Sequence, residues 1–185
     1  MTLPSKTEAE ALLHQYVTDP YQRYHALMVA TAMAGYARLR GEDESLWWNT
    51  GYLHDLDYDQ RPTEHPGPSL QWFRDWHYPE TLIHAIEAHA NGFNGFTTPP
   101  ETDLARALIA CDEICGIFYA YHKLNPIPFG EMKVKSIKKR LAESRFAPGI
   151  DRAHIYEGCE DFGVTIDDHI ANLITFFADL PAPQE

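Results

Sequence analysis

The chain contains little cysteine, and this shortage excludes one class of protein. Only three of its 185 residues are cysteines (Cys111, Cys115 and Cys159), and no two of them form a C-x-x-C pair. Their odd number argues against a disulfide framework. Cys111 and Cys115 are four residues apart on an expected helix, a spacing that could hold a soft metal. Two buried structural thiols are the preferred interpretation.

Positive charge is also scarce. The chain has 15 Lys and Arg residues against 27 Asp and Glu residues, which gives a net charge of −12. Non-specific binding to nucleic acid requires many exposed cations, so we do not expect it. A small phosphorylated ligand stays compatible with this charge, because a bound metal ion can supply positive charge locally.

Long apolar runs and nucleotide-binding fingerprints are missing as well. The longest mostly apolar stretch, ALMVATAMAGYA at 26–37, is too short to cross a bilayer, and the N-terminus lacks a basic-then-apolar signal. We therefore expect a cytoplasmic protein that does not contact membranes. No P-loop or dinucleotide motif occurs, so the sequence identifies no particular nucleotide, and it predicts no oligomeric state.

Helix signals fill most of the chain and predict an all-α fold, a single compact multi-helix domain over residues 1–185. Ser5 and Glu8 have capping-box spacing, and Thr98 and Glu101 repeat it before a long helix. Leu27, Ala30, Ala34 and Ala37 form a face suited to close packing. Residues 181–185 are expected to be a frayed tail. The expected helices are 5–17, 19–41, 44 to about 54, 69–77, 79–92, 98 to about 121, 131–146, 151–163 and 165–180.

Histidines and carboxylates on successive expected helices predict a metal site. Imidazole and carboxylate suit iron, manganese, zinc and related ions, and helical bundles supply such ligands from facing helices. Surface or capping roles suffice for His14, His77, His122, His154 and His169. The candidates that remain are His25, His54, His65, His84 and His89, with Asp55 directly after His54 and Asp112 farther along.

Asp112 is informative because it interrupts the apolar helix LARALIACDEICGIF. Burying a carboxylate is costly unless it is paired or coordinates a metal. Pairing with Arg106 or with a lysine is the alternative to metal binding.

The order His25, His54-Asp55, Asp112 resembles the HD-domain superfamily of metal-dependent phosphohydrolases. The segments HALMVATAMAGYARLRGEDESLWWNTGYLHDLDYD, LIHAIEAHANG, ALIACDEICGIF and KVKSIKKRLAESRFAPGIDR resemble its small bacterial HDIG-type members over about residues 20–165. One departure is plain, since Leu56 and Asp57 stand where the HDIG signature has isoleucine and glycine. The resemblance implies a helical HD-like bundle.

The resemblance also implies the ligands. One metal ion would be held by His25, His54, Asp55 and Asp112; members with two ions add two histidines, and His65 and His89 fit those places, with Asp55 bridging. His65 lies in a proline-rich loop, and His89 lies near a helix end that favours a cation, so both have structural alternatives. His84 competes with His89, but on a helix a separation of five residues turns the two side chains about 140° apart. Only one of them can therefore face the site, and the pattern AIEAH favours His89. We expect one or two divalent transition-metal ions (Fe, Mn, Ni, Co or Zn), with Mg disfavoured.

Further residues are candidates for chemistry or substrate binding. Asp55 and Asp57 are the candidate catalytic carboxylates; Asp57 could orient water or substrate, whereas capping or solvation is its preferred interpretation. Arg61, Lys133 and Lys135 are candidates for contact with an anionic substrate, because lysine can bind phosphate as a point charge. The alternative for the basic run KVKSIKKR is a solvated helix face.

Hydrolysis of a small phosphorylated substrate, a nucleotide or another phosphoester, is therefore the leading functional hypothesis. The same ligands would suit an HD-type di-iron oxygenase, which is the first alternative. A non-catalytic module that senses a nucleotide is the second.

Overall fold

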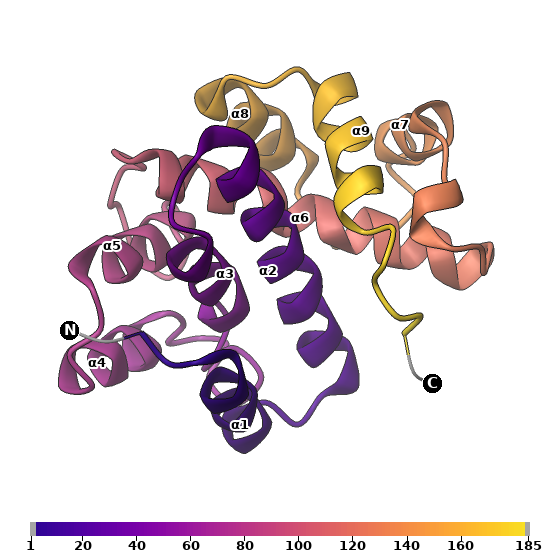
Figure 1. The fold of residues 1–185 in the computed structure, drawn as a ribbon. Coiled ribbons are helices and arrows are strands. Elements are labelled where there is room, and N and C mark those ends of the chain that lie inside the picture. The colour runs from indigo at the N-terminus through magenta and orange to yellow at the C-terminus, as the bar shows by residue number, and fades with distance from the viewer. Residues whose placement is uncertain (1–2, 184–185) are drawn as a thin grey trace.

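Helices make up all the regular secondary structure of residues 3–183, the part of the chain described by this computed structural model (Figure 1). No strand occurs in these residues, which confirms the expected all-α fold. The elements are α1 (Lys6–Tyr16), α2 (Pro20–Arg40), α3 (Glu44–Leu53), α4 (Gly67–Asp75), α5 (Glu80–His89), α6 (Asp103–Leu124), the 3₁₀ helix η1 (Phe129–Glu131), α7 (Val134–Ala142), α8 (Arg152–Phe162) and α9 (Ile166–Phe176).

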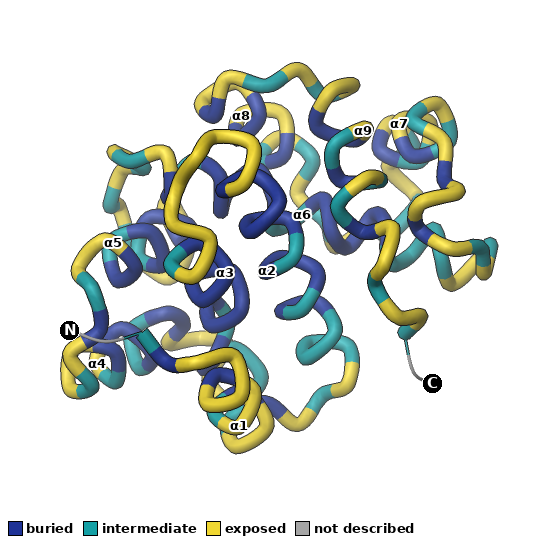
Figure 2. The backbone as a smooth tube through the Cα atoms, in the orientation of Figure 1, coloured by how far each residue is buried: buried dark blue, intermediate teal, exposed yellow. Residues whose placement is uncertain are grey.

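Helices α2 and α6 form the centre of the bundle. Helix α2 packs against α3 and α6, and α6 packs against α5 and α8. Figure 2 shows long buried stretches in both central helices, with exposed positions concentrated in the outer turns. On α2, Ala30, Ala34 and Ala37 are buried as expected, whereas Leu27 is only partly buried. This arrangement brings α2, α3, α5 and α6, which carry most of the candidate ligands, to one core.

The contact between α2 and α3 depends on Gly51. A Cβ atom at Gly51 would lie 3.0 Å from the N and Cα atoms of Ala30 and 2.9 Å from Cγ of Met33. The backbones of the two helices therefore approach more closely than a side chain at this position allows. His54 follows Gly51 by three residues, so the same contact positions the His-Asp pair beside α2.

We expect Gly51→Ala to destabilise the protein by about 1–3 kcal/mol, the usual cost of overpacking a core, because the backbone of Ala30 cannot move aside. Urea unfolding of metal-free protein measures the change. Gly149→Ala is the control, since a Cβ atom there meets nothing within 4 Å. Equal stability of Gly51→Ala and wild type would contradict this account of the contact.

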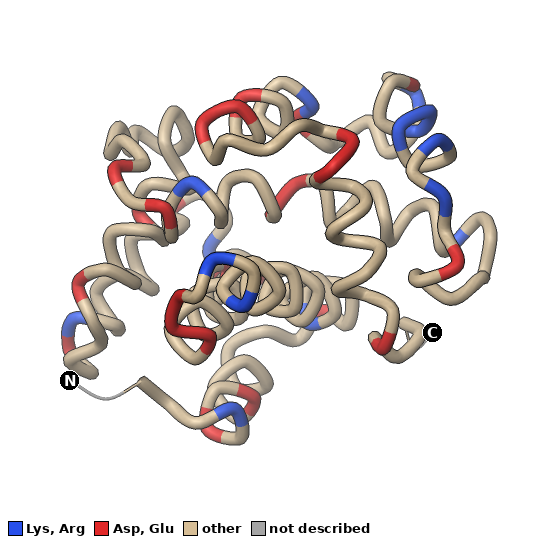
Figure 3. Tube along the Cα trace, turned by 45° about the horizontal axis from the view of Figure 1, so that its top comes forward, with Lys and Arg blue, Asp and Glu red and all other residues tan. Residues whose placement is uncertain are grey.

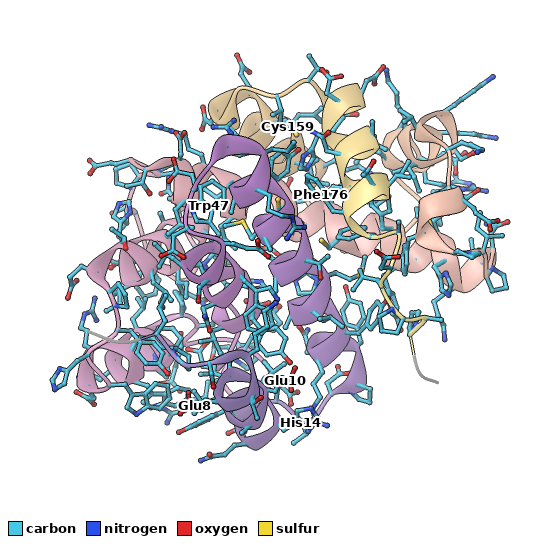
Figure 4. All side chains as sticks on the ribbon, in the orientation of Figure 1. Glu8, Glu10, His14, Trp47, Cys159 and Phe176 are labelled. Carbon is cyan, nitrogen blue, oxygen red and sulfur yellow. The ribbon has the colours of Figure 1, made fainter. Side chains whose placement is uncertain are left out.

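Helix α9 closes the bundle over α2. Phe176, labelled in Figure 4, reaches from α9 to the backbone of α2, where a Cβ atom at Gly35 would lie 2.3 Å from its ring. Its ring also packs edge-on against Tyr36 at 5.2 Å between centroids. The ring of Phe176 can therefore occupy this position only because Gly35 has no side chain.

One of the two predicted capping boxes is present. Ser5 and Glu8 form the reciprocal hydrogen bonds at the start of α1, as expected. Thr98 does not begin a helix: α6 starts five residues later, with Thr102 as its N-cap. The Thr98 hydroxyl donates instead to Glu87, at 2.8 Å. The prediction failed because Pro100 disfavours helical backbone at the residue before it, Pro99.

His169 is a second correction, because it is fully buried and not a surface or capping residue. Its Nε2–H donates to the Ala110 carbonyl at 2.9 Å, and its Nδ1 accepts from the Tyr36 hydroxyl at 2.5 Å. Burial lowers the pKa of His169 to about 4, so the neutral ring joins α9 to α2 and α6. The cysteines are buried and free, which agrees with the structural interpretation.

The C-terminal segment after α9 has no regular structure in its described residues. Pro181, expected to be frayed, is held through its carbonyl, which accepts from the Tyr24 hydroxyl at 2.7 Å. Residues 184 and 185 of the expected tail lie outside the described residues. Within residues 3–183, none of the helices has both the length and the apolar character needed to cross a membrane.

Candidate metal centre

Five separate segments bring the candidate ligands together. His25 is in the second turn of α2, His54 is the C-cap of α3, and Asp55 begins the turn after it. The other three ligands are His65 just before α4, His89 at the last position of α5, and Asp112 in the middle of α6.

One group of donor atoms lies between α2, α3 and α6. Nε2 of His25 is 2.9 Å from Oδ1 of Asp112, and Nε2 of His54 is 3.4 Å from the same oxygen. Oδ2 of Asp55 lies 3.3 Å from Nε2 of His54 and 4.0 Å from Nε2 of His25. Ligand atoms about 2.1 Å from a shared ion are roughly 3.0–3.4 Å apart in octahedral or tetrahedral geometry. Three of these four separations match that spacing or come within 0.1 Å of it.

A second group of donor atoms uses the other oxygen of Asp55. Oδ1 of Asp55 is 3.3 Å from Nε2 of His65 and 3.6 Å from Nε2 of His89. The two histidine nitrogens are 3.2 Å apart. Asp55 therefore presents one carboxylate oxygen to each group, which is the arrangement of a carboxylate that bridges two ions.

Hydrogen bonds behind three of the histidines direct Nε2 toward the centre. Nδ1–H of His54 donates to the Gly51 carbonyl at 2.8 Å, and Nδ1–H of His89 donates to the Ile86 carbonyl. Nδ1–H of His65 donates to Oδ1 of Asp57 at 2.6 Å. A ring that donates from Nδ1 keeps a lone pair on Nε2, the form that binds a metal.

Two features indicate that these residues fit a metal ion. Nε2 of His54 is buried and has no hydrogen-bond partner, which is costly for a polar atom. The Nε2 lone pairs of His65 and His89 face each other at 3.2 Å, an arrangement that a shared cation stabilises. The donor set of four imidazoles and two carboxylates suits a transition-metal ion.

The electrostatics of the centre favour ionised carboxylates. Burial alone would raise the pKa of Asp55, but His54 and its neighbours hold that pKa well below its usual value. Burial is likewise outweighed at Asp112, whose pKa is lowered chiefly by His54 and His25. The two carboxylates hold the pKa of His54 well above its usual value, against the effect of burial. Two negative charges therefore converge on these histidines, and a cation complements them.

Asp57 lies directly behind His65. Its side chain is buried, so of the preferred expectation, capping or solvation, the solvation part is wrong. Oδ1 accepts from His65, and Oδ2 accepts from the backbone N–H of Ser69 in the first turn of α4, at 3.0 Å. Asp57 does cap a helix, but that helix is α4, which follows His65, and not α3, which precedes Asp57. It does not line the cavity described below, so its role in this geometry is to position His65.

We expect Asp57→Asn to weaken metal binding at the His65–His89 group by about 10–100-fold, the usual cost of losing an outer partner of a ligand. An amide cannot accept at both atoms, so either His65 loses its acceptor or Ser69 faces an N–H group. Competition with a chelator measures the affinity of each metal equivalent. Asp59→Asn is the control, because Asp59 binds Thr18 instead. Unchanged affinity in Asp57→Asn would contradict the positioning role.

A cavity of about 630 Å³ opens onto this centre, within the usual range for a small-molecule site. His25, Asp55, His65, His89 and Asp112 line it, and His54 lies fully buried behind them. His84 does not line it. The sequence did not single out most of the outer wall, which comprises Tyr21, Gln22, Tyr58, Ala90, Asn91, Gly92, Phe93, Glu113, Gly116, Gly149, Ile150, Asp151 and His154.

The structure does not bring the predicted cationic residues to this cavity. Arg61 is half-exposed and lies 3.4 Å from Glu64. Lys133 and Lys135 are exposed at the start of α7, and Figure 3 shows Lys and Arg positions gathered along that helix. No Lys or Arg of the described chain lines the cavity. Contact between these three residues and a substrate stays a prediction that this geometry does not support.

Glu113 is the wall residue that the sequence came closest to revealing, because it interrupts the same apolar helix as Asp112. Burial, and then the charge of Asp112, raise the pKa of Glu113 to about 7. Its carboxylate accepts a hydrogen bond from the backbone N–H of Asp151 at 3.3 Å. This contact ties α6 to the N-terminus of α8 at the edge of the cavity.

Comparison with known families agrees with the geometry. Residues 23–116, just over half of the chain, match the family model described as HD domain. The matched segment contains all six side chains of the centre. Searches of curated proteins and of solved structures find no significant match. The chain belongs to the HD-domain family.

Proposed function

We propose that this protein is a metal-dependent hydrolase that acts on a small phosphorylated substrate, a nucleotide or another phosphoester. The observation that carries the proposal is Asp55, whose two oxygens face two separate groups of histidine nitrogens. Membership of the HD-domain family, whose members are generally metal-dependent hydrolases, supports it.

Each ligand has a definite place in this proposal. One ion would be held by His25, His54 and Asp112, a second by His65 and His89, and Asp55 would be shared. Two divalent ions held in this way supply Lewis-acid activation of water and neutralise charge on a phosphoryl group. The mixed imidazole and carboxylate set favours Fe, Mn, Ni, Co or Zn over Mg, which prefers oxygen ligands.

The remaining residues of the chain prepare the site for that chemistry. The low pKa values of Asp55 and Asp112 keep both carboxylates ionised and able to bind a cation at neutral pH. Backbone carbonyls and Asp57 fix the ring orientations of three histidines. His54 and His65 are buried, and within residues 3–183 the cavity described above gives a substrate access to the donor atoms.

The test is turnover with defined metals. Protein purified without chelator and loaded with Mn, Fe, Ni, Co or Zn is expected to release inorganic phosphate from members of a panel of phosphomonoesters and nucleotides. Chelation should remove that activity, and metal should restore it. Absence of phosphate release with every metal and substrate of the panel would contradict the proposal.

The same donor set favours one further function, oxidation by a di-iron centre. That reading predicts substrate-dependent oxygen uptake by iron-loaded protein and no phosphate release, so the two assays separate the functions. Tight nucleotide binding without turnover under any metal would indicate a non-catalytic sensing module.

A further inference from the structure

The outer wall of the cavity carries two acidic side chains with no cationic partner. Glu113 and Asp151 line it, and neither forms an ion pair within residues 3–183. Their contacts are to backbone N–H groups: Glu113 accepts from Asp151, and Asp151 accepts from His154 at 3.2 Å. Because no Lys or Arg of the described chain lines the cavity, these carboxyl groups have no positive charge opposite them.

Aromatic rings line the same cavity. Tyr21 comes from α2, Tyr58 from the turn after Asp55, and Phe93 from the loop after α5. Tyr58 packs edge-on against His65 at 5.2 Å between ring centroids, so it borders the metal centre. Burial raises the pKa of both Tyr21 and Tyr58, and carboxylates of the cavity, chiefly Asp112 for Tyr21 and Asp55 for Tyr58, raise it further. Carboxylates and aromatic rings that line one cavity are the chemistry that recognises an ammonium group.

At the metal centre the same cavity favours an anionic group rather than an ammonium group. There the donor atoms of Asp55 and of the histidines converge, and Nε2 of His54 is buried without a hydrogen-bond partner. A metal cation would stabilise this arrangement, and the bound cation would in turn attract an anionic group. A molecule bound at the metal centre would have the carboxyl groups of Glu113 and Asp151 in the wall of the same cavity.

We propose that the substrate is a small phosphomonoester whose far end carries an ammonium group, held between Glu113, Asp151 and the rings of Tyr21 and Tyr58. This inference rests on the proposed hydrolysis for the role of the phosphate end. A second anionic group on the substrate would lie against carboxylates with no cation to offset them, and juxtaposed like charges are costly. We therefore expect polyphosphates to bind weakly.

Three phosphomonoesters of similar size test this directly: 2-aminoethyl phosphate, propyl phosphate and phosphoglycolate, which end in a cation, a neutral group and an anion. With metal-loaded protein at pH 7.5, we expect kcat/KM to fall by about 10-fold or more at each step of that order. Binding of the same compounds, measured by calorimetry, should follow the same order. Equal binding of the three, or preference for phosphoglycolate, would overturn the inference.

The variant Glu113→Gln/Asp151→Asn tests the residues. Asparagine also caps helices, so the N-terminus of α8 is retained. We expect the preference for 2-aminoethyl phosphate over phosphoglycolate to fall from about 100-fold to within about 3-fold, in binding and in turnover. Glu157→Gln, an exposed carboxylate on the same helix, is the control and should keep the wild-type ratio. A preference that survives in the double variant would overturn the assignment.

The two proposals fail in different ways. If the binding order holds but no compound is hydrolysed with any metal, phosphoester hydrolysis is contradicted and the ammonium site is supported. If all three compounds are hydrolysed and bound alike, hydrolysis is supported and the ammonium site is contradicted.

Discussion

Asp55→Ala is expected to abolish metal loading and turnover together. Its two oxygens lie 3.3 Å from Nε2 of His54 and 3.3 Å from Nε2 of His65, so one substitution removes a ligand from both groups. Loss of an outer partner alone typically weakens metal binding by about 10–100-fold, and loss of a shared ligand should exceed that at both positions. Elemental analysis and phosphate release measure the two effects on the same sample.

Asp59→Ala is the matched control for Asp55→Ala. Asp59 belongs to the same turn but accepts hydrogen bonds from Thr18 and does not line the cavity. It should keep its metal and its activity, and circular dichroism should show a folded helical protein for both variants. Full activity in Asp55→Ala, or equal loss in Asp59→Ala, would contradict the assignment.

His89→Ala is expected to remove one ion and leave the other. We assign His89 to the group that contains His65 and Oδ1 of Asp55, although its donor atom also lies within 4.8 Å of those of His54 and Asp112, and the other ion would keep the four ligands assigned to it. Metal content should fall from about two ions per chain to about one, and turnover by at least about 100-fold, since one side of the two-metal clamp is lost. Metal titration followed by phosphate release measures both quantities.

His84→Ala separates ligand loss from general damage to α5. His84 is on the same helix, five residues from His89, and does not line the cavity. It should retain two ions and near wild-type turnover. Loss of an ion in His84→Ala but not in His89→Ala would assign the ligands the other way round.

Much of the centre could be predicted from the sequence because its ligands violate the local pattern. Asp112 stands in an apolar helix, where a carboxylate needs a compensating partner, and the structure places it 2.9 Å from His25 and not beside Arg106. His54 and Asp55 follow an apolar helix directly, at its buried end. For His89, the helical period shows that it and His84 cannot both face the centre, and its place in AIEAH favours His89. These local rules identify the candidates, and the resemblance to the HD-domain superfamily supplies their assignment as ligands.

The parts that could not be predicted depend on tertiary contacts between distant segments. Asp57 looks like a surface residue in the sequence, and only the return of the chain at His65 and Ser69 buries it. His169 lies among aspartates in the sequence, yet Tyr36 and Ala110 enclose it from two other helices. The basic run near Lys133 suits either a solvated helix face or a substrate site, and the fold favours the first, because Lys133 and Lys135 are exposed and do not line the cavity.

The central claim is that Asp55 bridges two metal ions. The most direct measurement is the metal content of wild-type protein, purified without chelator and loaded with an excess of Mn or Fe before unbound metal is removed. The account predicts two ions per chain, and one ion in His89→Ala. One ion per chain in the wild type, with no change in His89→Ala, would contradict it.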